Sequence, residues 1–155
     1  MFEHFGSSTR SAVIAAQEEA RRQGTRTVGT EHLLQGLLNA DEGRLSHALG
    51  MDAANCRAAL DSMDADALAA VGVDIADFGE LRSPKVRGHL PLTTGAKTVL
   101  VQALRETRAA KQRSIAAEHL LLALLTRPRP DPVAELLGRL AVDPAMVRAR
   151  LSLAA

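Results

Sequence analysis

The chain of 155 residues lacks tryptophan and tyrosine, and it holds only three phenylalanines and one cysteine. A single cysteine excludes an intramolecular disulfide. Because Cys56 lies in a stretch of helix-forming residues, we expect it to be a small buried hydrophobic residue rather than a nucleophile. With so few aromatic side chains, alanine and leucine must fill most of the core, and both favour helices. The composition predicts an all-α fold.

The sequence also lacks a large net charge and long apolar runs. The formal net charge is +1, which leaves no large positive field to hold a phosphate backbone, so we expect no nucleic acid as partner. The N-terminus has neither the basic region nor the apolar run of a signal peptide, and no stretch of about 18 apolar residues occurs. These absences predict a protein that is cytoplasmic and does not bind membranes.

No constellation of catalytic residues emerges from the sequence. Glu31-His32 and Glu118-His119 have the wrong order and spacing for a His-Glu-x-x-His zinc motif, and no cysteine cluster is present. We find no acid-base pair, activated nucleophile or cofactor loop. We therefore predict a protein that is not an enzyme and that needs neither a metal nor a cofactor.

The chain does contain an internal repeat. Residues 27–38 read TVGTEHLLQGLL and residues 114–125 read SIAAEHLLLALL, a separation of 87 positions. After an insertion of four residues in the second copy, the segment 49–52 matches 140–143. Each half therefore has the same order of parts.

Each half is predicted to fold as a four-helix motif. A long amphipathic helix over roughly 8–23, or 95–111 in the second copy, is followed by a short helix. In the first copy this short helix opens at Thr30, whose hydroxyl group suits an N-cap. Two further short helices follow, the second capped by Asp52 or Asp143. About eight helices result, and we expect the two halves to pack as a pseudo-twofold tandem repeat, since neither offers enough apolar surface to be stable alone.

The domain organisation follows from this repeat. We predict a single domain over 1–155, made of repeat 1 (1–62), a connector (63–91) and repeat 2 (92–155). Within the connector, residues 64–82 are expected to form one or two extra short helices. The segment SPKVRGHLP after them is expected to be flexible, because it contains Pro84, Gly88 and Pro91.

Five motifs in register resemble a known family. They are the opening MFEHF, the AQEEAR of 16–21, the GHLPLT of 88–93, and the two Glu-His-Leu-Leu segments. Together they are similar to the Clp N-terminal repeat domain of ClpC- and ClpA-type unfoldases. The resemblance covers nearly the whole chain.

The resemblance implies a helical domain that recruits substrates and adaptors for an ATP-driven unfoldase. In members of this family the glutamates of the two Glu-His pairs contact the guanidinium of phosphoarginine-marked substrates, which places that role on Glu31 and Glu118. The family pattern Thr-x-Arg after the first aromatic residue is absent from both halves, so the arginines that would hold the phosphate are missing. Hydroxyl groups and helix N-terminal amides remain as phosphate ligands.

A second surface follows from the resemblance. In actinobacterial relatives, cyclic peptide antibiotics bind between the first helix and the connector. The matching positions are Phe2, Arg10, Ile14, His89, Leu92 and Lys97. Leu92 replaces the family's phenylalanine, which removes aromatic contact area there.

We therefore predict a monomeric, non-catalytic module that binds peptides or proteins of the Clp system, or cyclic peptides, without an ATPase of its own. It would act as an adaptor, regulator or decoy. Two alternatives stay open. The chain is the N-terminal fragment of a full-length Clp unfoldase, or it is a helical DNA-binding regulator. The second would need a basic recognition face and helix-turn-helix spacing, and neither is found.

Overall fold

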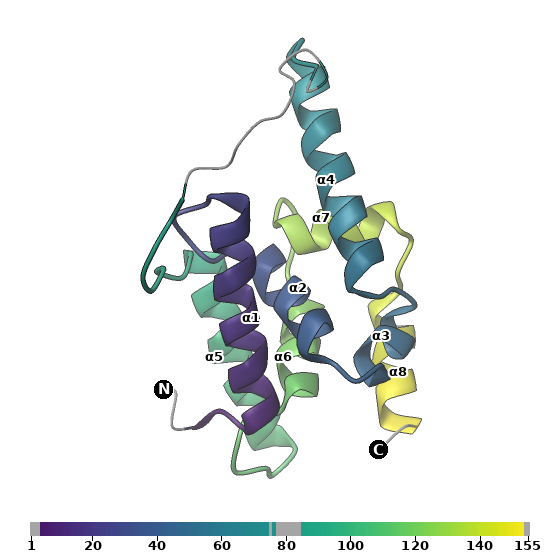
Figure 1. Ribbon diagram of the computed structural model, residues 1–155. Helices are drawn as coiled ribbons and strands as arrows, with labels where there is room; N and C mark the ends of the chain where they lie inside the picture. The colour runs from purple at the N-terminus through teal and green to yellow at the C-terminus, as the bar shows by residue number, and fades with distance from the viewer. Residues whose placement is uncertain (1–3, 75, 77–84, 154–155) are drawn as a thin grey trace.

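The computed structural model describes residues 4–74, 76 and 85–153, and this part of the chain contains eight helices and no strand (Figure 1). The helices are α1 (Ser7–Gln23), α2 (Thr30–Ala40), α3 (Arg44–Leu49), α4 (Ala53–Ala70), α5 (Thr94–Ala109), α6 (Ala117–Leu124), α7 (Pro132–Arg139) and α8 (Pro144–Leu153). The all-α class and the tandem repeat are confirmed: α1–α4 and α5–α8 follow each other in the same order.

The long helix of each repeat packs along the helix that follows it, α1 along α2 and α5 along α6 (Figure 1). Gly36 permits the first of these contacts, because a Cβ atom at this position would lie 2.3 Å from the carbonyl oxygen of Ala12 and 2.6 Å from the amide nitrogen of Ala16. The matching position in α6 is Ala123, which is buried without such a conflict. The α1–α2 contact therefore depends on a glycine.

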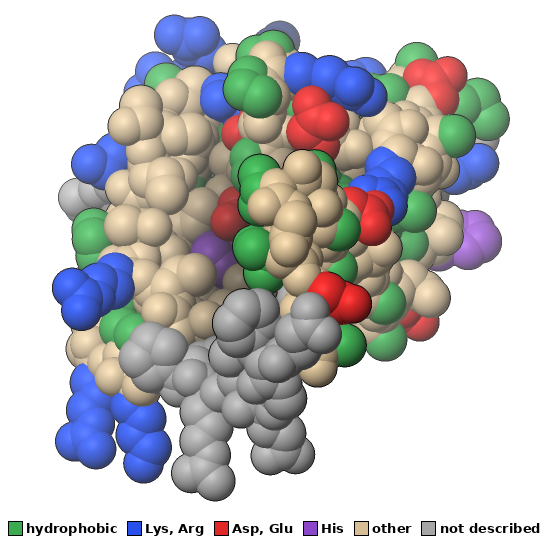
Figure 2. All heavy atoms as spheres, turned by 90° about the horizontal axis from the view of Figure 1, so that it is seen from above, with side chains coloured by type: hydrophobic (Ala, Val, Ile, Leu, Met, Phe, Trp, Pro, Cys, Tyr) green, Lys and Arg blue, Asp and Glu red, His purple; other side chains and the backbone are tan. Residues whose placement is uncertain are grey.

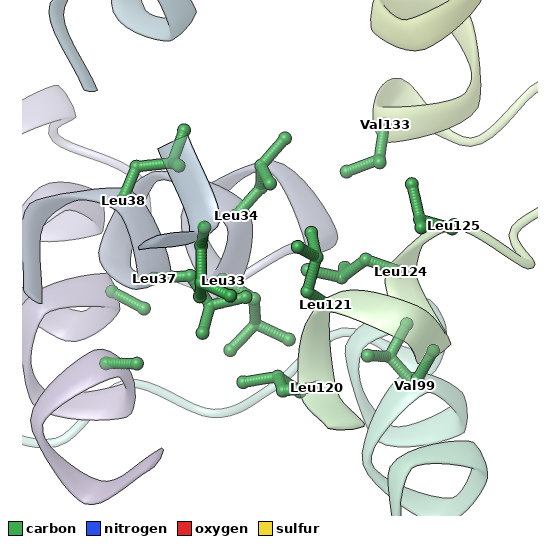
Figure 3. Close-up of a cluster of buried hydrophobic side chains, with 14 of the residues drawn as sticks. Leu33, Leu34, Leu37, Leu38, Val99, Leu120, Leu121, Leu124, Leu125 and Val133 are labelled. Carbon is green, nitrogen blue, oxygen red and sulfur yellow. The ribbon is translucent and has the colours of Figure 1, made fainter. Parts of the chain in front are cut away.

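The core lies where α2 and α6 face each other. Figure 3 shows leucines of both helices pointing into one cluster, which Val99 of α5 and Val133 of α7 complete. The largest of these side chains are fully buried, namely Leu33, Leu34, Leu37, Leu120, Leu121 and Leu124. Because burying one such side chain contributes about 1.5–3 kcal/mol, this shared cluster holds the two repeats together.

Two isolated β-bridges connect the repeats, and in each bridge the segment before the long helix of one repeat pairs with a segment of the other. Phe5 of repeat 1 pairs in parallel with Ile115 of repeat 2, and Leu92 of repeat 2 pairs in parallel with Val28 of repeat 1. Their hydrogen bonds match: the amide of Gly6 donates to Ile115 O (3.0 Å), and the amide of Thr93 donates to Val28 O (2.9 Å). Each long helix is thus anchored at its start to the other repeat.

The connector differs from its prediction. Asp52 caps α4 as expected, accepting from the amide of Asn55 (2.8 Å), but the helix continues for 18 residues to Ala70. The predicted boundary at residue 62 falls inside it, and residues 64–70 belong to this helix instead of forming a separate short one. Its second half projects from the body of the molecule (Figure 1), braced by an ion pair between Asp66 and Arg139 of α7. Residue 75 and residues 77–84 lie outside the described residues.

None of the described helices is long and apolar enough to cross a lipid bilayer.

Candidate functional site

Two related clefts open where the repeats meet. Each is formed by the start of the long helix of one repeat, the start of the second helix of the other, and a loop that follows a second helix. The two predicted glutamates lie one in each, so we name them the Glu118 cleft and the Glu31 cleft. Their volumes are about 480 Å³ and about 430 Å³.

The Glu118 cleft lies between α1, α6 and the end of α2. It is lined by Ser7, Ser8, Ser11, Leu37, Ala40, Asp41, Glu42, Arg44, Leu45, Ala116, Ala117 and Glu118. Arg44 Nη2 donates to Glu118 Oε2 at 2.8 Å, and both side chains remain partly exposed. The carboxylate in this cleft therefore already binds a guanidinium group of the protein itself.

The Glu31 cleft lies between α2, α5 and the loop before α7. It is lined by Gly29, Thr30, Glu31, Thr93, Gly95 and residues 127–132. Thr30 was predicted as the N-cap of α2, but Gly29 holds that position, and the Thr30 hydroxyl instead donates to Asp131 Oδ1 (2.8 Å). Asp131 Oδ2 accepts from Arg127 Nε (3.0 Å). Asp131 therefore binds both the start of α2 and the side chain of Arg127.

Glu31 differs from Glu118 in its ionic partners. Among the residues that the structure describes, no lysine or arginine pairs with Glu31. The nearest ring nitrogen, His32 Nδ1, is 3.9 Å away. That nitrogen accepts the amide hydrogen of Gly29 (2.9 Å), and burial lowers the pKa of His32 even though Glu31, Glu19 and Asp64 oppose this shift. His32 is thus neutral at pH 7, and the Glu31 carboxylate, 27% exposed, carries an unpaired charge.

One residue explains why the two glutamates point differently. The Glu31 carboxylate folds over Gly29, where a Cβ atom would lie 2.4 Å from Oε2. The matching residue before α6 is Ala116, whose Cβ occupies this space. Since Glu118 cannot fold back in the same way, its carboxylate extends toward Arg44.

A network of polar side chains connects His32, in the first turn of α2, with α1 and α4. His32 Nε2 contacts Gln23 Oε1 (3.0 Å), and Gln23 Nε2 donates to Glu19 Oε1 (3.2 Å). Glu19 also accepts from Arg22 (2.6 Å) and Arg57 (2.9 Å). Burial alone raises the pKa of Glu19, but these hydrogen bonds offset it and lower the value to about 2.

The second repeat keeps only part of this network. His119 Nδ1 accepts from the amide of Ala116 (3.1 Å), as His32 does from Gly29. Glu106, which matches Glu19, lies 3.6 Å from Arg148. The residue that matches Gln23 is Ala110, so the link from the glutamate to the histidine is absent.

A third and larger cavity, of about 580 Å³, lies near α3 and α8. It is lined by Leu49, Gly50, Met51, Asn55, residues 140–143, Met146, Val147 and Arg150. Two of its polar side chains already have structural partners: Asp143 Oδ1 accepts from the amide of Ala145 (3.0 Å), and Arg150 Nη1 donates to Ala48 O (3.0 Å). We regard the two clefts as the candidate site because each holds one of the two predicted glutamates.

The structure describes five of the six residues of the second predicted surface. Ile14 is 61% exposed on α1, and Arg10 and Lys97 are exposed near the starts of α1 and α5. His89 is exposed, whereas Leu92 is half-buried because it forms the bridge to Val28. Phe2 lies outside the described residues.

The structure adds cations that sequence reasoning missed. Arg44, at the start of α3, lines the Glu118 cleft, and Arg127 and Arg129, in the loop after α6, line the Glu31 cleft. The sequence signal for the two arginines of the Glu31 cleft is the basic segment TRPRPDP of residues 126–132. Its place beside Glu31 depends on the path of the loop.

Two helical repeats that exchange β-bridges and enclose matching clefts define the class of double-repeat helical domains. The chain belongs to the family described as Clp repeat (R) N-terminal domain, whose model matches residues 4–129 and residues 91–155. Its solved neighbours include the N-terminal domain of the chaperone ClpD from Arabidopsis thaliana, with a TM-score of 0.75, 25% identity, and coverage of 99% of this chain and 95% of that one. The Hsp104 N-terminal domain from Candida albicans shares the fold alone (TM-score 0.63, 18% identity, coverage of 95% and 88%).

Longer proteins match as well. They include the chloroplastic ClpA homolog of Brassica napus, an ATP-binding subunit of the ATP-dependent Clp protease, and the chloroplastic chaperone protein ClpC1 of Arabidopsis thaliana. Each is 32% identical over 154 residues, or 97% of this chain, and the chain spans 16% and 15% of their lengths. Since both relatives are chloroplastic, the cytoplasmic location of this chain stays a prediction.

Proposed function

We propose that this domain is a non-catalytic receptor of the Clp system that binds segments of proteins in its two clefts. The observation that carries the proposal is the Glu31 carboxylate, which lines the Glu31 cleft and has no lysine or arginine partner among the described residues. A carboxylate offers two oxygens that match the fork of a guanidinium group. An arginine-type side chain of the ligand therefore binds there first.

The cations of the Glu31 cleft suit a ligand that also carries an anion. Arg127 reaches toward Gly95, with Nη2 3.6 Å from the position of a Cβ atom there, and Arg129 lines the same cleft. Each arginine already pairs with a carboxylate, Arg127 with Asp131 (3.0 Å) and Arg129 with Glu135 (3.7 Å). We propose that their remaining N–H groups serve in place of the two arginines that the family pattern has after its first aromatic residue. Phosphoarginine, with a guanidinium and a phosphate in one side chain, is accordingly the ligand we propose to test.

The Glu118 cleft has the same chemistry in a self-occupied form. A ligand guanidinium must displace Arg44 from Glu118 before it can bind, and the displaced Arg44 is then available to an anionic group of the ligand. We expect this cleft to be the weaker of the two. The difference should be about 0.2–1 kcal/mol, the usual contribution of an exposed ion pair.

Isothermal titration calorimetry with free phosphoarginine tests the proposal. Glu31→Gln should remove the tighter binding event, whereas Glu118→Gln, the matched control in the other repeat, should leave it unchanged. Arg44→Ala should strengthen the binding of free arginine at the Glu118 cleft, because it removes the guanidinium group that competes for Glu118. Free arginine and phosphate as separate titrants show which half of the ligand is recognised. If Glu31→Gln and Glu118→Gln bind phosphoarginine as tightly as the unaltered chain, the assignment of the glutamates is wrong.

A second candidate function is the sequestration of Clp-targeting cyclic peptides. The observation that favours it is the exposed Ile14, an apolar side chain one turn along α1 from the exposed Arg10. Titration of a cyclic peptide onto Phe2→Ala and Ile14→Ala tests this role, since Glu31→Gln should not affect it. Binding that persists in both variants would rule out this surface.

A further inference from the structure

A row of basic side chains runs along the outer face of α5. Lys97, Arg105 and Arg108 are exposed, and Val101, 43% exposed, lies among them. Their spacing of four, four and three residues places them on one face of the helix, over roughly 16 Å. Lys111 and Arg113, also exposed, follow in the turn after α5. We call Lys97, Val101, Arg105 and Arg108 the basic row.

The basic row has no structural partner. In the part of the chain that the structure describes, none of its three cations forms an ion pair or a side-chain hydrogen bond. The nearby carboxylate Glu106 instead accepts from Gln102 (3.3 Å) and lies 3.6 Å from Arg148. The matching row on α1 is Arg10, Ile14, Glu18 and Arg21.

The two rows differ in both charge and contacts. Arg21 donates twice to the carbonyl oxygen of Gly88, at 2.9 and 2.6 Å, so it has a structural role. On α1 an acid, Glu18, also stands where α5 has Arg105. The basic row is therefore a property of repeat 2 and does not follow from the repeat itself.

The stability of α5 does not explain the row. Like charges at positions three or four apart destabilise a helix, as Arg105 and Arg108 do here. Lys97 lies in the first turn, where the helix dipole disfavours a cation, and only Arg108 lies in the last turn, where a cation is favoured. The unpaired charges thus have a cost without a compensating contact inside the domain.

We propose that the basic row docks an acidic segment of a partner protein, with carboxylates spaced along the row and an apolar side chain covering Val101. Lys and Arg side chains line the left edge of the face in Figure 2, the side on which α1 and α5 lie in Figure 1. Residues 92–155 hold ten lysines and arginines against five acids, whereas residues 1–62 hold six against eight. A phosphate backbone longer than the row would therefore meet the acidic part of the molecule, and it has no group to cover Val101.

Fluorescence anisotropy with a labelled helical peptide of glutamate, alanine and a single leucine tests the proposal. Arg105→Glu with Arg108→Glu should weaken binding about tenfold, since each reversal turns an attraction into a repulsion. The matched control is Lys85→Glu with Arg87→Glu, which makes the same change in net charge at exposed positions outside the row. Circular dichroism verifies that both variants are folded.

Four outcomes would overturn the proposal: no binding of the acidic peptide, equal weakening in both double variants, tighter binding of a short DNA duplex than of the peptide, or salt-dependent self-association that the Arg105 and Arg108 reversals abolish. The last would make a second copy of this chain the occupant. Phosphoarginine binding in the clefts should be the same in all these variants, so failure here leaves the proposed function untouched.

Discussion

Repeat 1 and repeat 2 share their order of helices but differ in where they bury and where they expose polar groups. Repeat 1 has the glycine-dependent contact of α1 with α2 and the buried network around Glu19. Repeat 2 has an alanine at the matching contact, a looser ion pair at Glu106, and the exposed basic row. The comparison shows that the shared fold fixes the order and packing of the helices. The polar side chains of each repeat are free to differ and can serve different functions.

The largest difference is expected from the glycine in α2. Gly36→Ala places a methyl group 2.3 Å from the carbonyl oxygen of Ala12, and the backbone of α1 must move. We expect a loss of about 3 kcal/mol in the free energy of unfolding, measured by urea denaturation with circular dichroism. The reciprocal control Ala123→Gly should cost only about 1 kcal/mol, through helix propensity. Equal losses would show that α1–α2 and α5–α6 pack alike.

A smaller effect is expected from the buried carboxylate. The pKa of Glu19 is about 2 in the folded protein against an ordinary value of 4.5, so the unfolded chain binds the proton more tightly. Its contribution is therefore fully present above about pH 4.5 and is lost as the pH falls toward about 2.

Glu19→Gln removes this contribution. The variant should be about 2 kcal/mol less stable at neutral pH, with a flatter acid dependence of the free energy of unfolding, measured by urea titration across the acid range. Glu106→Gln, the matching change in repeat 2, should cost less because Glu106 is more exposed and its ion pair is longer. If both variants retain the acid dependence of the unaltered chain, the network around Glu19 does not cause it.

Exchanging the residues that precede the two second helices, Gly29 before α2 and Ala116 before α6, should reverse which cleft binds phosphoarginine more tightly. Gly29→Ala adds the methyl group that Ala116 already has, and its backbone is extended, so the change is tolerated. Displacement of the Glu31 carboxylate should weaken phosphoarginine binding at the Glu31 cleft about fivefold, or about 1 kcal/mol, in calorimetry. Ala116→Gly should shift Glu118 away from Arg44 and strengthen the other cleft. An unchanged affinity in both variants would contradict this explanation of the two orientations.

The smallest effect is expected from transferring charge to repeat 1. Glu18→Arg gives α1 the same pattern of charge as the basic row, yet Arg21 stays bound to Gly88. Binding of the acidic peptide should therefore rise only about twofold in anisotropy, within the range of exposed pairs. Glu18→Gln is the neutral control. A gain as large as the loss from reversing Arg105 and Arg108 would show that any exposed cation suffices.

Much of the fold was predictable because hydrophobic periodicity sets helix positions. The long helices begin and end within two residues of the prediction, and both Asp52 and Asp143 cap helices as expected. The length of α4 was not predictable, because its second half is mostly exposed and lacks an apolar stripe.

The site was predictable only in its carboxylates. The repeat placed Glu31 and Glu118 at equivalent positions, but their different partners depend on Gly29 and on the paths of two loops. Arg44 and Glu118 belong to different repeats and are far apart in the sequence, so only the fold brings them together. Sequence spacing therefore gave no signal of their pairing.

The exchanged β-bridges make the chain resemble a dimer joined by a tether. Phe5 and Leu92 each complete the other half, so neither repeat is self-contained. Two fragments divided within the connector should therefore find each other and reassemble, as the subunits of a domain-swapped dimer do. The connector then supplies a high local concentration of one half for the other, and the domain is suited to reconstitution from two separately expressed pieces.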